Sequence, residues 1–583
     1  MKKIIVAETA GFCMGVRRAV NLVLELVEQT REPIYTIGPL IHNPQVVELL
    51  KQRGVIPVES PDEIQQGMVV IRSHGISSAV RKELSAKSLK IIDATCPRVA
   101  RVHRIVEKYA KEGTWIIILG DPGHSEVEGI LGFAGENSVV VQNPEDLQKL
   151  PEANRVLLVA QTTQSQKRFA QVAEAVKQRY CELESGRIQI INTICDSTER
   201  RQDEVSALAQ EVDAFVIVGG RQSANTRRLK EIGESYGRPA YLVESEEDLD
   251  FSVLEPAGKV GLTAGASTPN WMIRRVYEAL HTASLKNRRF PIRVFYQLLR
   301  FLGILNFYLA LGASLLTALV GILHSGKINP FAGLTAFLYV FSIHNFNLLS
   351  SPRLLEVIEP ARGKFFLRHR RSLIYLSLLG LVSGGIFSAL INPWALLFYA
   401  GLCVLSLLYQ AQFRPAVKGA VFRFRSLMDI PGSKDIFSAL AWAVMIVLVP
   451  LSGKPGSHFT FKVWLIFVLV FLMVIARSMV QDFRDLQADR IAGKETLPTL
   501  LGAKGSRAMI HSLLSLAVII LLASFRAEFF GLPELGLLIG LIWLWLCVPF
   551  FTRRPIIQGL RAELLIDFSF ILASLVGLGL KIF

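Results

Sequence analysis

Three cysteines occupy equivalent places in the sequence, each a few residues after a strand-like run that contains two adjacent isoleucines. Thiolates from three separate loops can hold a cubane iron–sulfur cluster and leave one iron without a protein ligand, and that iron is then a Lewis acid. Packing is the commoner explanation for a lone buried cysteine, but it does not explain three at matching strand ends. The three are Cys13, Cys96 and Cys195, which follow the isoleucines at 4–5, 91–92 and 190–191.

Two alternatives to this open cluster follow from the same residues. Cys181 is a candidate fourth ligand that would close the cluster, although it lies in a helix-like stretch, VKQRYCELES, and not at a strand end. A zinc site of three cysteines, with or without a histidine, also fits the spacing and would serve a hydrolase.

Polar turns after other strand-like runs carry hydrogen-bond donors suited to an anion. Histidines occur in HNP, SHG and GHSE turns, and hydroxyl and amide groups occur in SANT and GASTP. Such a set fits a diphosphate, although any one histidine is as often a structural residue. The donors are His42, His74, His124, Ser223, Asn225 and Ser267.

Glu126 follows His124 in the same turn, where burial would raise the pKa of its carboxyl and make it a proton donor. Glu128 is the alternative donor, and for either residue a solvated carboxylate at a helix start is the simpler interpretation. Thr162, in AQTTQ, could pass a proton or hold a substrate hydroxyl, with the adjacent Thr163 as the alternative. We take Glu126, Thr162 and His124 as the candidate catalytic residues.

The elements that must position these residues are strands of parallel sheets. Apolar runs that end in polar turns alternate with helical segments, which is the α/β pattern, and ligands of such sheets bind at the carboxyl ends of the strands. The three cysteines predict three similar α/β units about a pseudo-threefold axis. The runs are YTIGPLIHN, MVVIRSHG, LKIIDATCP, TWIIILGDPGHSE, RVLLVAQTT, IQIINTICD, DAFVIVGG and KVGLTAGAST.

Composition divides the chain into two halves. Its 583 residues are 51% hydrophobic with a mean hydropathy of +0.39, and the excess lies after about residue 285, in long apolar runs typical of membrane spans. The net charge of +15 is explained by basic loops between spans, so we predict no nucleic-acid partner. The start, MKKIIVAETAGF, is too polar for a signal peptide. We therefore expect a cytoplasmic first half with reduced thiols.

Nine motifs, in this order, resemble the 4-hydroxy-3-methylbut-2-enyl diphosphate reductase (IspH or LytB) family over residues 1–282: GFCMGV, HNPQVV, SHG, DATCP, GHSEVEG, QTT, NTICDST, SANT and ASTP. The resemblance implies a trefoil around a 4Fe–4S cluster on the three cysteines, and a diphosphate pocket on the donors above. Ala224 stands where some members have serine, so only its backbone can contribute. The implied reaction takes two electrons from a ferredoxin or flavodoxin, loses water and yields isopentenyl and dimethylallyl diphosphate.

The second half predicts an all-α domain of about nine membrane spans. A basic juxtamembrane linker, 286–300, joins the reductase-like domain, 1–285, to this membrane domain, 301–583. Most Arg and Lys follow the even-numbered spans, which places those loops and the first half on the cytoplasmic side of a cell (inner) membrane. The spans are 301–323, 331–346, 373–391, 394–411, 436–452, 461–480, 508–524, 532–551 and 565–583.

The segment QDFRDLQADRIAGKETLP spaces three aspartates along one helical face, where they can hold Mg²⁺ that bridges a diphosphate. A solvated face balanced by Arg484 and Arg490 is the alternative. The aspartates are Asp482, Asp485 and Asp489.

This segment resembles the second aspartate motif of the UbiA intramembrane prenyltransferases, so the resemblance implies a polyprenyl diphosphate ligand. The first motif, Asn-x-x-x-Asp, departs from the family, since Ser351 follows Asn347 where Asp is expected. Glu356 or Glu359 could substitute, and Lys434 could face the diphosphate or be a topology charge. Alternatively, this half serves only as a membrane anchor.

Overall fold

The computed structural model describes residues 3–30, 32–87, 89–181, 186–286, 290–350, 355, 359–410, 430, 432–451, 460–492, 496–553 and 559–581. The chain divides into two compact units, Met1–Leu285 and Lys286–Phe583, and each is described by itself.

The first unit contains three four-stranded sheets that share one topology, and every strand pair in them is parallel. One sheet combines the first strand of the chain with the last three of the unit, whereas the other two are built from contiguous segments. In order across each sheet, the strands are β1 (Lys3–Val6), β12 (Lys259–Ala264), β10 (Ala214–Val218) and β11 (Ala240–Val243); β5 (Lys90–Asp93), β4 (Met68–Ile71), β2 (Ile34–Ile37) and β3 (Val55–Val58); and β9 (Ile188–Ile190), β8 (Val156–Ala160), β6 (Trp115–Leu119) and β7 (Ser138–Val141).

Strands in equivalent positions of the three sheets lead to turns of the same kind. The edge strands β1, β5 and β9 lead to the three cysteines, and the two inner strands lead to the polar turns. The opposite edge strands β3, β7 and β11 lead to capped 3₁₀ turns: η1 (Pro61–Glu63), η2 (Pro144–Lys149) and η3 (Glu246–Asp248). The predicted α/β trefoil of three units is confirmed, but these three outer strands were not predicted.

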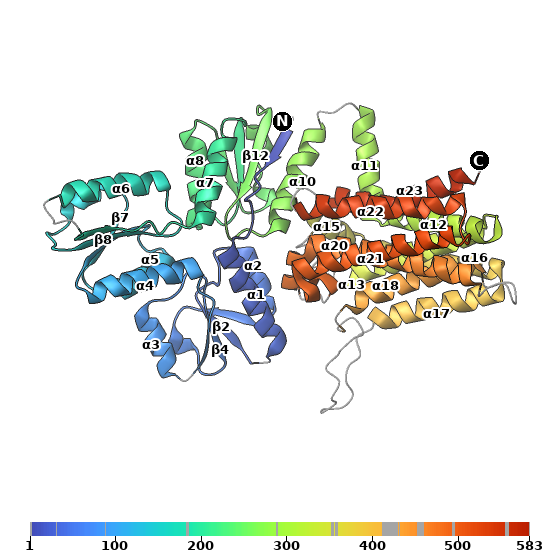
Figure 1. Ribbon diagram of the computed structural model, residues 1–583, viewed down its shortest axis with the longest axis horizontal. Coiled ribbons are helices and arrows are strands. Elements are labelled where there is room, and N and C mark those ends of the chain that lie inside the picture. Colours follow the sequence, from blue (N-terminus) through green and yellow to red (C-terminus); the bar gives the residue numbers. More distant parts are fainter. Residues whose placement is uncertain are drawn as a thin grey trace. The chain divides into compact units, whose positions relative to one another are not determined.

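Helices cover both faces of the sheets because side chains of successive strand residues point to opposite faces. In β6, Ile117 and Leu119 pack with α6, whereas Ile116 and Ile118 pack with α4 and α5, and Figure 1 shows α6 on one side of β7 and β8 with α4 and α5 on the other. The helices are α1 (Met14–Gln29), α2 (Pro44–Gln52), α3 (Ser78–Ala86), α4 (Pro97–Lys111), α5 (Ser125–Ala134), α6 (Gln166–Arg179), α7 (Asp196–Leu208), α8 (Ala224–Ser235), α9 (Phe251–Leu254) and α10 (Asn270–Lys286).

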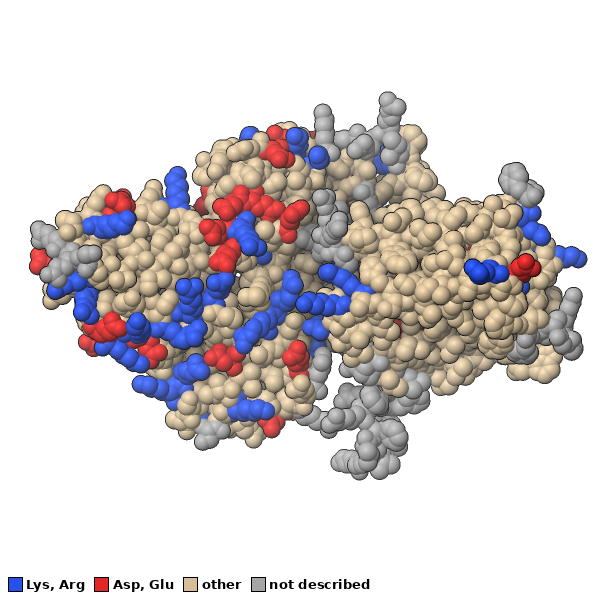
Figure 2. Space-filling view, in the orientation of Figure 1, with Lys and Arg blue, Asp and Glu red and all other residues tan. Residues whose placement is uncertain are grey.

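The described part of the second unit is helical throughout. Eight of its helical segments are long and apolar enough to cross a membrane, and the predicted fourth span is the shorter apolar stretch Pro393–Tyr409. Figure 2 shows few charged side chains over this unit on the face in view. Its helices are α11 (Phe290–Ile304), α12 (Phe307–Ser325), α13 (Pro330–Ser350), α15 (Pro360–Arg368), α16 (Arg370–Ile391), α17 (Pro393–Gln410), α18 (Ser433–Ala443), η5 (Val444–Leu448), α19 (Val449–Leu451), α20 (Phe461–Ala492), α21 (Leu497–Arg526), η6 (Leu532–Glu534), α22 (Leu535–Arg553) and α23 (Gly559–Leu580).

Several span boundaries differ from the prediction, among them the start of the seventh span, which lies at Leu497 and not at 508. The first span begins at Phe307 and not at 301, because Asn306 adopts a left-handed conformation (φ 59°) and its amide donates to Asn345 Oδ1 (3.0 Å). The sixth span continues to Ala492 and does not end near 480. Its charged extension is stabilised by ion pairs with other helices, which hydropathy does not reveal.

Candidate active site and membrane cavity

The three cysteines are equivalent in three dimensions. Each is the residue that precedes a helix, α1, α4 or α7, where the helix dipole favours a thiolate. Each backbone N–H donates to a carbonyl in the turn after the neighbouring inner strand. These hydrogen bonds are Cys13 to Ala266 (3.0 Å), Cys96 to Ser73 (2.9 Å) and Cys195 to Thr162 (3.0 Å).

The thiols also converge. Burial raises the pKa of the Cys96 thiol, and its Cys13 and Cys195 neighbours raise it further. A Cβ on Gly15 would lie 2.5 Å from Cys96 Sγ, so only glycine lets the start of α1 come this close. All three cysteines are free, and Cys181 is exposed after α6, outside this set.

No group of three or more His, Cys, Asp or Glu side chains among the described residues could hold a single metal ion. A cubane binds its thiolates through separate irons, so its ligands stand further apart than those of one zinc ion. Three free thiols at helix starts, with the Cys96 thiol close to the start of α1 at Gly15, are a donor set that suits such a cluster.

The three histidines form one cluster. Their ring centroids are 4.3 Å apart for His42 and His74, 5.2 Å for His42 and His124, and 5.9 Å for His74 and His124. Burial, followed by the charges of His124 and Arg72, lowers the pKa of His42 to about 4. Burial likewise lowers the pKa of His74 and of His124. The imidazoles are therefore neutral near pH 7.

Glu126 is 1% exposed, and both oxygens of its carboxylate bond to Thr162. Thr162 donates its backbone N–H to Oε1 (2.7 Å) and its hydroxyl to Oε2 (3.0 Å). Burial raises the pKa of Glu126 to about 7, although the hydrogen bonds from Thr162 oppose the shift. Glu128 is exposed, and Thr163 accepts instead from Gln161 (3.0 Å).

The remaining predicted donors come from the sheet that contains β1. The Ser267 hydroxyl donates to the His42 carbonyl (2.9 Å), which joins this sheet to the histidine cluster. Ser223 precedes α8 and accepts from Thr226 N–H (3.4 Å), and Ala224 is buried beside it. Asn225 is 3% exposed, yet neither its amide nitrogen nor its oxygen has a hydrogen-bond partner. Such a buried amide is suited to a ligand.

Two neighbours of the cluster escaped the sequence analysis. Arg72 lowers the pKa of all three histidines by its positive charge, and its Nε donates to the Gly75 carbonyl (3.2 Å). Ser125 Oγ lies 3.2 Å from His42 Nε2. Both residues belong to the polar turns RSHG and GHSE. Their places beside the predicted histidines could therefore have identified them as site residues.

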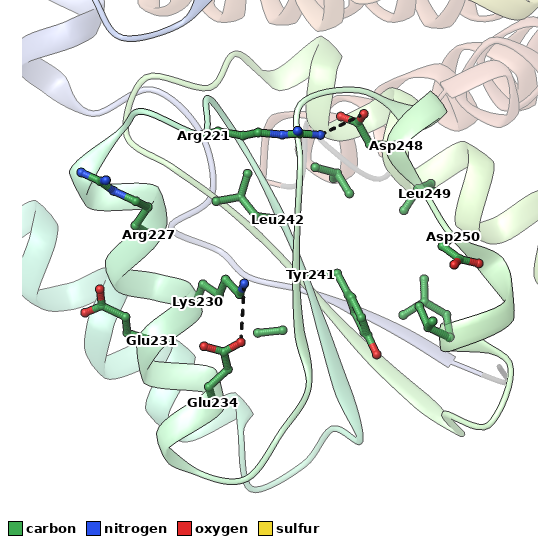
Figure 3. Close-up of a pocket in the computed structure, with 14 residues that line it drawn as sticks. Arg221, Arg227, Lys230, Glu231, Glu234, Tyr241, Leu242, Asp248, Leu249 and Asp250 are labelled. Carbon is green, nitrogen blue, oxygen red and sulfur yellow. Dashed lines mark hydrogen bonds and ion pairs between the residues drawn. The ribbon is translucent and has the colours of Figure 1, made fainter.

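A different pocket, of about 610 Å³, lies between α8 and the segment from β11 to α9. Four of its charged side chains form two ion pairs, Arg221 with Asp248 (3.3 Å) and Lys230 with Glu234 (3.6 Å), as Figure 3 shows. None of the predicted site residues lines it. We therefore assign the chemistry to the histidine cluster and not to this pocket.

The second unit encloses a cavity of about 580 Å³. All four residues predicted for a metal or a prenyl diphosphate line it: Asn347, Asp482, Asp485 and Asp489. Lys434 Nζ contacts both oxygens of Asp482 (2.8 and 2.9 Å). Ser351 and Glu356 lie outside the described residues, so the first motif is described only through Asn347 and Glu359.

Ion pairs between distant helices surround this cavity. The Arg484 side chain, 2% exposed, pairs with Asp485 (2.5 Å) and with Glu563 (3.1 Å). Arg362 pairs with Glu563 (3.1 Å) and with Glu359 (3.2 Å).

A separate pair joins Arg477 to Asp567 (2.7 Å). Arg477, Glu563 and Asp567 were missed, although charged residues inside apolar spans are a functional signal.

Comparisons with known proteins divide the chain in the same way. Residues 4–281 match the family model described as LytB protein, and residues 366–559 match that of the UbiA prenyltransferase family. A 4-hydroxy-3-methylbut-2-enyl diphosphate reductase of Geobacter sulfurreducens is 41% identical over 286 residues, which cover 49% of this chain and 99% of the relative.

Two solved structures are also similar. An (E)-4-hydroxy-3-methyl-but-2-enyl diphosphate reductase is 41% identical, with 48% of this chain and 99% of that chain covered and a TM-score of 0.38. A UbiA homologue from Archaeoglobus fulgidus, bound to GPP and Mg²⁺, is 14% identical, with 49% and 98% covered and a TM-score of 0.35.

Proposed function

Since the chain belongs to the LytB family of 4-hydroxy-3-methylbut-2-enyl diphosphate reductases, we propose that its histidine cluster and the adjoining cysteines form the active site. The reaction replaces the substrate hydroxyl with hydrogen: the alcohol, two electrons and two protons give isopentenyl or dimethylallyl diphosphate and water. The observation that carries the assignment is the buried Glu126–Thr162 pair, whose Thr162 carbonyl accepts from Cys195 N–H (3.0 Å).

Cys13, Cys96 and Cys195 would hold the 4Fe–4S cluster. When bound, such a cluster supplies electrons and an open iron that can act as a Lewis acid toward the substrate oxygen. The chain contributes the three thiols and the backbone hydrogen bonds that hold each cysteine turn against a pocket turn.

The diphosphate would bind among His42, His74, His124, Ser223, Asn225 and Ser267. Neutral imidazoles donate N–H bonds without repelling one another, and they can take up protons when the anion arrives. The unpartnered Asn225 amide gains its first hydrogen bonds from the ligand, whereas Ala224 offers only its backbone.

Glu126 would supply the proton that turns the leaving hydroxyl into water. A pKa of about 7 leaves a large protonated fraction at neutral pH, which a general acid requires. The Thr162 hydroxyl, bonded to Glu126 Oε2 (3.0 Å), would position the substrate hydroxyl or relay the proton. His124 lies at the start of α5 and accepts Glu126 N–H at Nδ1 (3.1 Å), so it orients the turn that carries the acid.

The test uses the full chain, purified without oxygen in detergent and reconstituted with iron and sulfide. We expect about four irons per chain and reduction of the substrate with dithionite and methyl viologen. Cys96→Ser should lose both iron and turnover, while Cys181→Ser should keep both. A protein that binds zinc in place of iron and lacks reductase activity would overturn the assignment.

For the membrane half we propose prenyl transfer, or binding of a prenyl diphosphate, in the 580 Å³ cavity. One Mg²⁺ fits its charge, because six acidic side chains on the wall outnumber four basic ones. Asp482, Asp485 and Asp489, with Asn347 nearby on the wall, would hold the ion, which would bridge the diphosphate. Lys434 contacts the same Asp482 carboxylate, so the lysine and the ion would share this group.

Binding of Mn²⁺ and of geranylgeranyl diphosphate to the full chain tests this second function. Asp482→Asn with Asp485→Asn should abolish both while leaving reductase turnover intact. Glu534→Gln is the matched control, since Glu534 pairs with Lys462 (2.8 Å) away from the cavity wall. If the parent chain binds neither probe, the membrane half is an anchor only.

We propose the domain limits 1–285, 286–300 and 301–583, with the reductase on the cytoplasmic side of the inner membrane. The basic residues between the second and third spans support this orientation, as does the need for reduced thiols; they are Arg362, Lys364, Arg368, Arg370 and Arg371. Ferredoxin or flavodoxin would supply the electrons. Labelling Cys181 in intact and in opened cells would check the side, since its thiol is exposed.

A further inference from the structure

Electrons must reach the three cysteines from outside, and the structure shows which side is open. Glu126, Thr162 and Ser267 are buried, whereas the three cysteines and the three histidines of the pocket are partly exposed. Met14, the residue after Cys13, is 66% exposed. The helix starts that carry the cysteines therefore reach solvent, and a partner can approach the site from this side.

Helix α4, which begins at Cys96, presents a basic stripe on this side. Five of its basic residues recur at intervals of three or four, which places them along one face of the helix. Figure 2 shows Lys and Arg gathered over α4. The residues of this α4 stripe are Arg98, Arg101, Arg104, Lys108 and Lys111.

Three charges of the α4 stripe are free for a partner. Within the described residues, Arg101, Arg104 and Lys108 are exposed and make no ion pair with a carboxylate. By contrast, Arg98 pairs with Asp196 of α7, and Lys111 pairs with Glu107.

The neighbouring helix α1 extends this surface. Arg17 is exposed one turn after Cys13, and Arg18 crosses to the Cys96 turn, where it donates to the Thr95 carbonyl (2.9 Å). Met14, exposed and next to Cys13 in the sequence, adds an apolar side chain to this surface. On α7, in contrast, Asp196 and Glu199 make the third helix start acidic.

We propose that the α4 stripe, with Arg17 and Met14, is the docking surface for an acidic one-electron carrier protein. The proposal rests on the reductase function above. Unpaired positive charge steers an acidic protein to the surface, and the exposed Met14 beside Cys13 gives the contact an apolar core. Two reduced carriers, two protons and one substrate give two oxidised carriers, water and the five-carbon diphosphate.

The test compares two electron sources on the full chain. Reduced acidic ferredoxin needs a docking surface, whereas methyl viologen does not. We expect Arg101→Glu with Arg104→Glu to lower kcat/KM for ferredoxin about tenfold or more and to leave viologen-driven turnover and iron content unchanged. In the parent chain, salt should slow only the ferredoxin reaction.

A matched control makes the same change of charge on α6. Lys167→Glu with Lys177→Glu alters exposed residues of the helix that covers the opposite sheet face from α4, and it should leave both reactions unchanged. An equal loss in this control would mean that total charge, and not the stripe, steers the carrier.

Other outcomes separate this proposal from the reductase function. A parent chain without viologen-driven turnover would refute the reductase assignment itself. An unchanged ferredoxin kcat/KM in the α4 variant would refute the docking surface alone.

If that variant instead loses a dependence of turnover on phosphatidylglycerol in reconstituted vesicles, the stripe binds lipid and the docking proposal is wrong. If the variant loses iron, the salt dependence of turnover in the parent chain tests the docking surface in its place. A salt effect on the ferredoxin reaction alone would support docking, and equal salt effects on both electron sources would contradict it.

Discussion

The two sites of this chain treat buried polar groups in opposite ways. Around the histidine cluster, the Asn225 amide has no partner and burial keeps the imidazoles neutral. At the membrane cavity, each basic side chain on the wall already contacts a carboxylate. The first site therefore meets its ligand with unsatisfied groups, while the second must open internal ion pairs. Polar groups in the pocket are thus free to bind a ligand, whereas polar groups in the cavity already hold helices together through ion pairs.

The largest effect on stability should follow from removing one partner of the cavity network. Arg484→Met leaves Asp485 and Glu563 buried without their shared cation, which should destabilise the chain by about 3–5 kcal/mol. Thermal unfolding in detergent measures this loss. Adding Glu563→Gln should restore part of it, because fewer negative charges are then left unpaired. A stable single variant would contradict the contrast between the two sites.

In the pocket, an equally buried change should spare the fold and stop the chemistry. Glu126→Gln keeps the shape and the hydrogen bonds of a neutral acid but cannot release a proton, so kcat should fall by about 10² to 10⁴-fold. The melting temperature should stay within error of the parent. Because the pKa of Glu126 is raised to about 7, parent activity should decline as pH rises through 7.

Glu128→Gln serves as the control for that change, since Glu128 is exposed on the same helix. It should alter neither kcat nor the pH profile. If Glu128→Gln loses activity and Glu126→Gln does not, the proton donor has been misassigned.

A smaller effect is expected from the unpartnered amide. Asn225→Ala removes hydrogen bonds that form only with ligand, so KM for the substrate should rise about tenfold, equivalent to about 1.4 kcal/mol. Stability should rise or stay constant, because no native hydrogen bond is lost. A marked loss of stability would mean that the amide already has a partner.

The smallest effect concerns protons taken up on binding. The pKa of His42 is about 4 without ligand, and a bound diphosphate should raise it, so binding near pH 6 should take up a fraction of a proton. Calorimetry in two buffers of different ionisation enthalpy measures this uptake, and identical heats would contradict it.

The lowered pKa of His42 also makes folding stability depend on pH. The contribution is fully present above pH 6.5 and is lost as the pH falls toward 4.

Strand ends were the most predictable part of this fold. Apolar runs that end in polar turns indicated eight of the nine strands that lead to site residues, and the paired isoleucines before Cys13 indicated the ninth, β1. The outer strands β3, β7 and β11 were not predicted because the turns after them carry none of the candidate site residues that indicated the other strands, and β3 contains Pro57. Their following turns, VESPDE, VQNPED and VESEED, share a capping pattern that could have shown a threefold repeat.

The ion pairs of the membrane cavity were beyond sequence reasoning for a different reason. Spacing along one helix suggests partners three or four residues apart, as between Asp482 and Asp485. Arg484, however, pairs with Glu563 of α23 (3.1 Å), and Lys434 of α18 pairs with Asp482 of α20. Which residues pair depends on which helices pack against each other. Apolar spans of similar composition give no pattern from which that packing can be predicted.

The pairing of β1 with β12, in which Lys3 lies opposite Lys259, has a consequence for the order of assembly during synthesis. Two sheets form from contiguous segments, but the sheet next to Cys13 must wait for a strand made near the end of this half. Closing so long a loop is slow. The first thiol to leave the ribosome is thus the last to be held in place, so cluster insertion should follow release of residue 264, shortly before the first membrane span emerges.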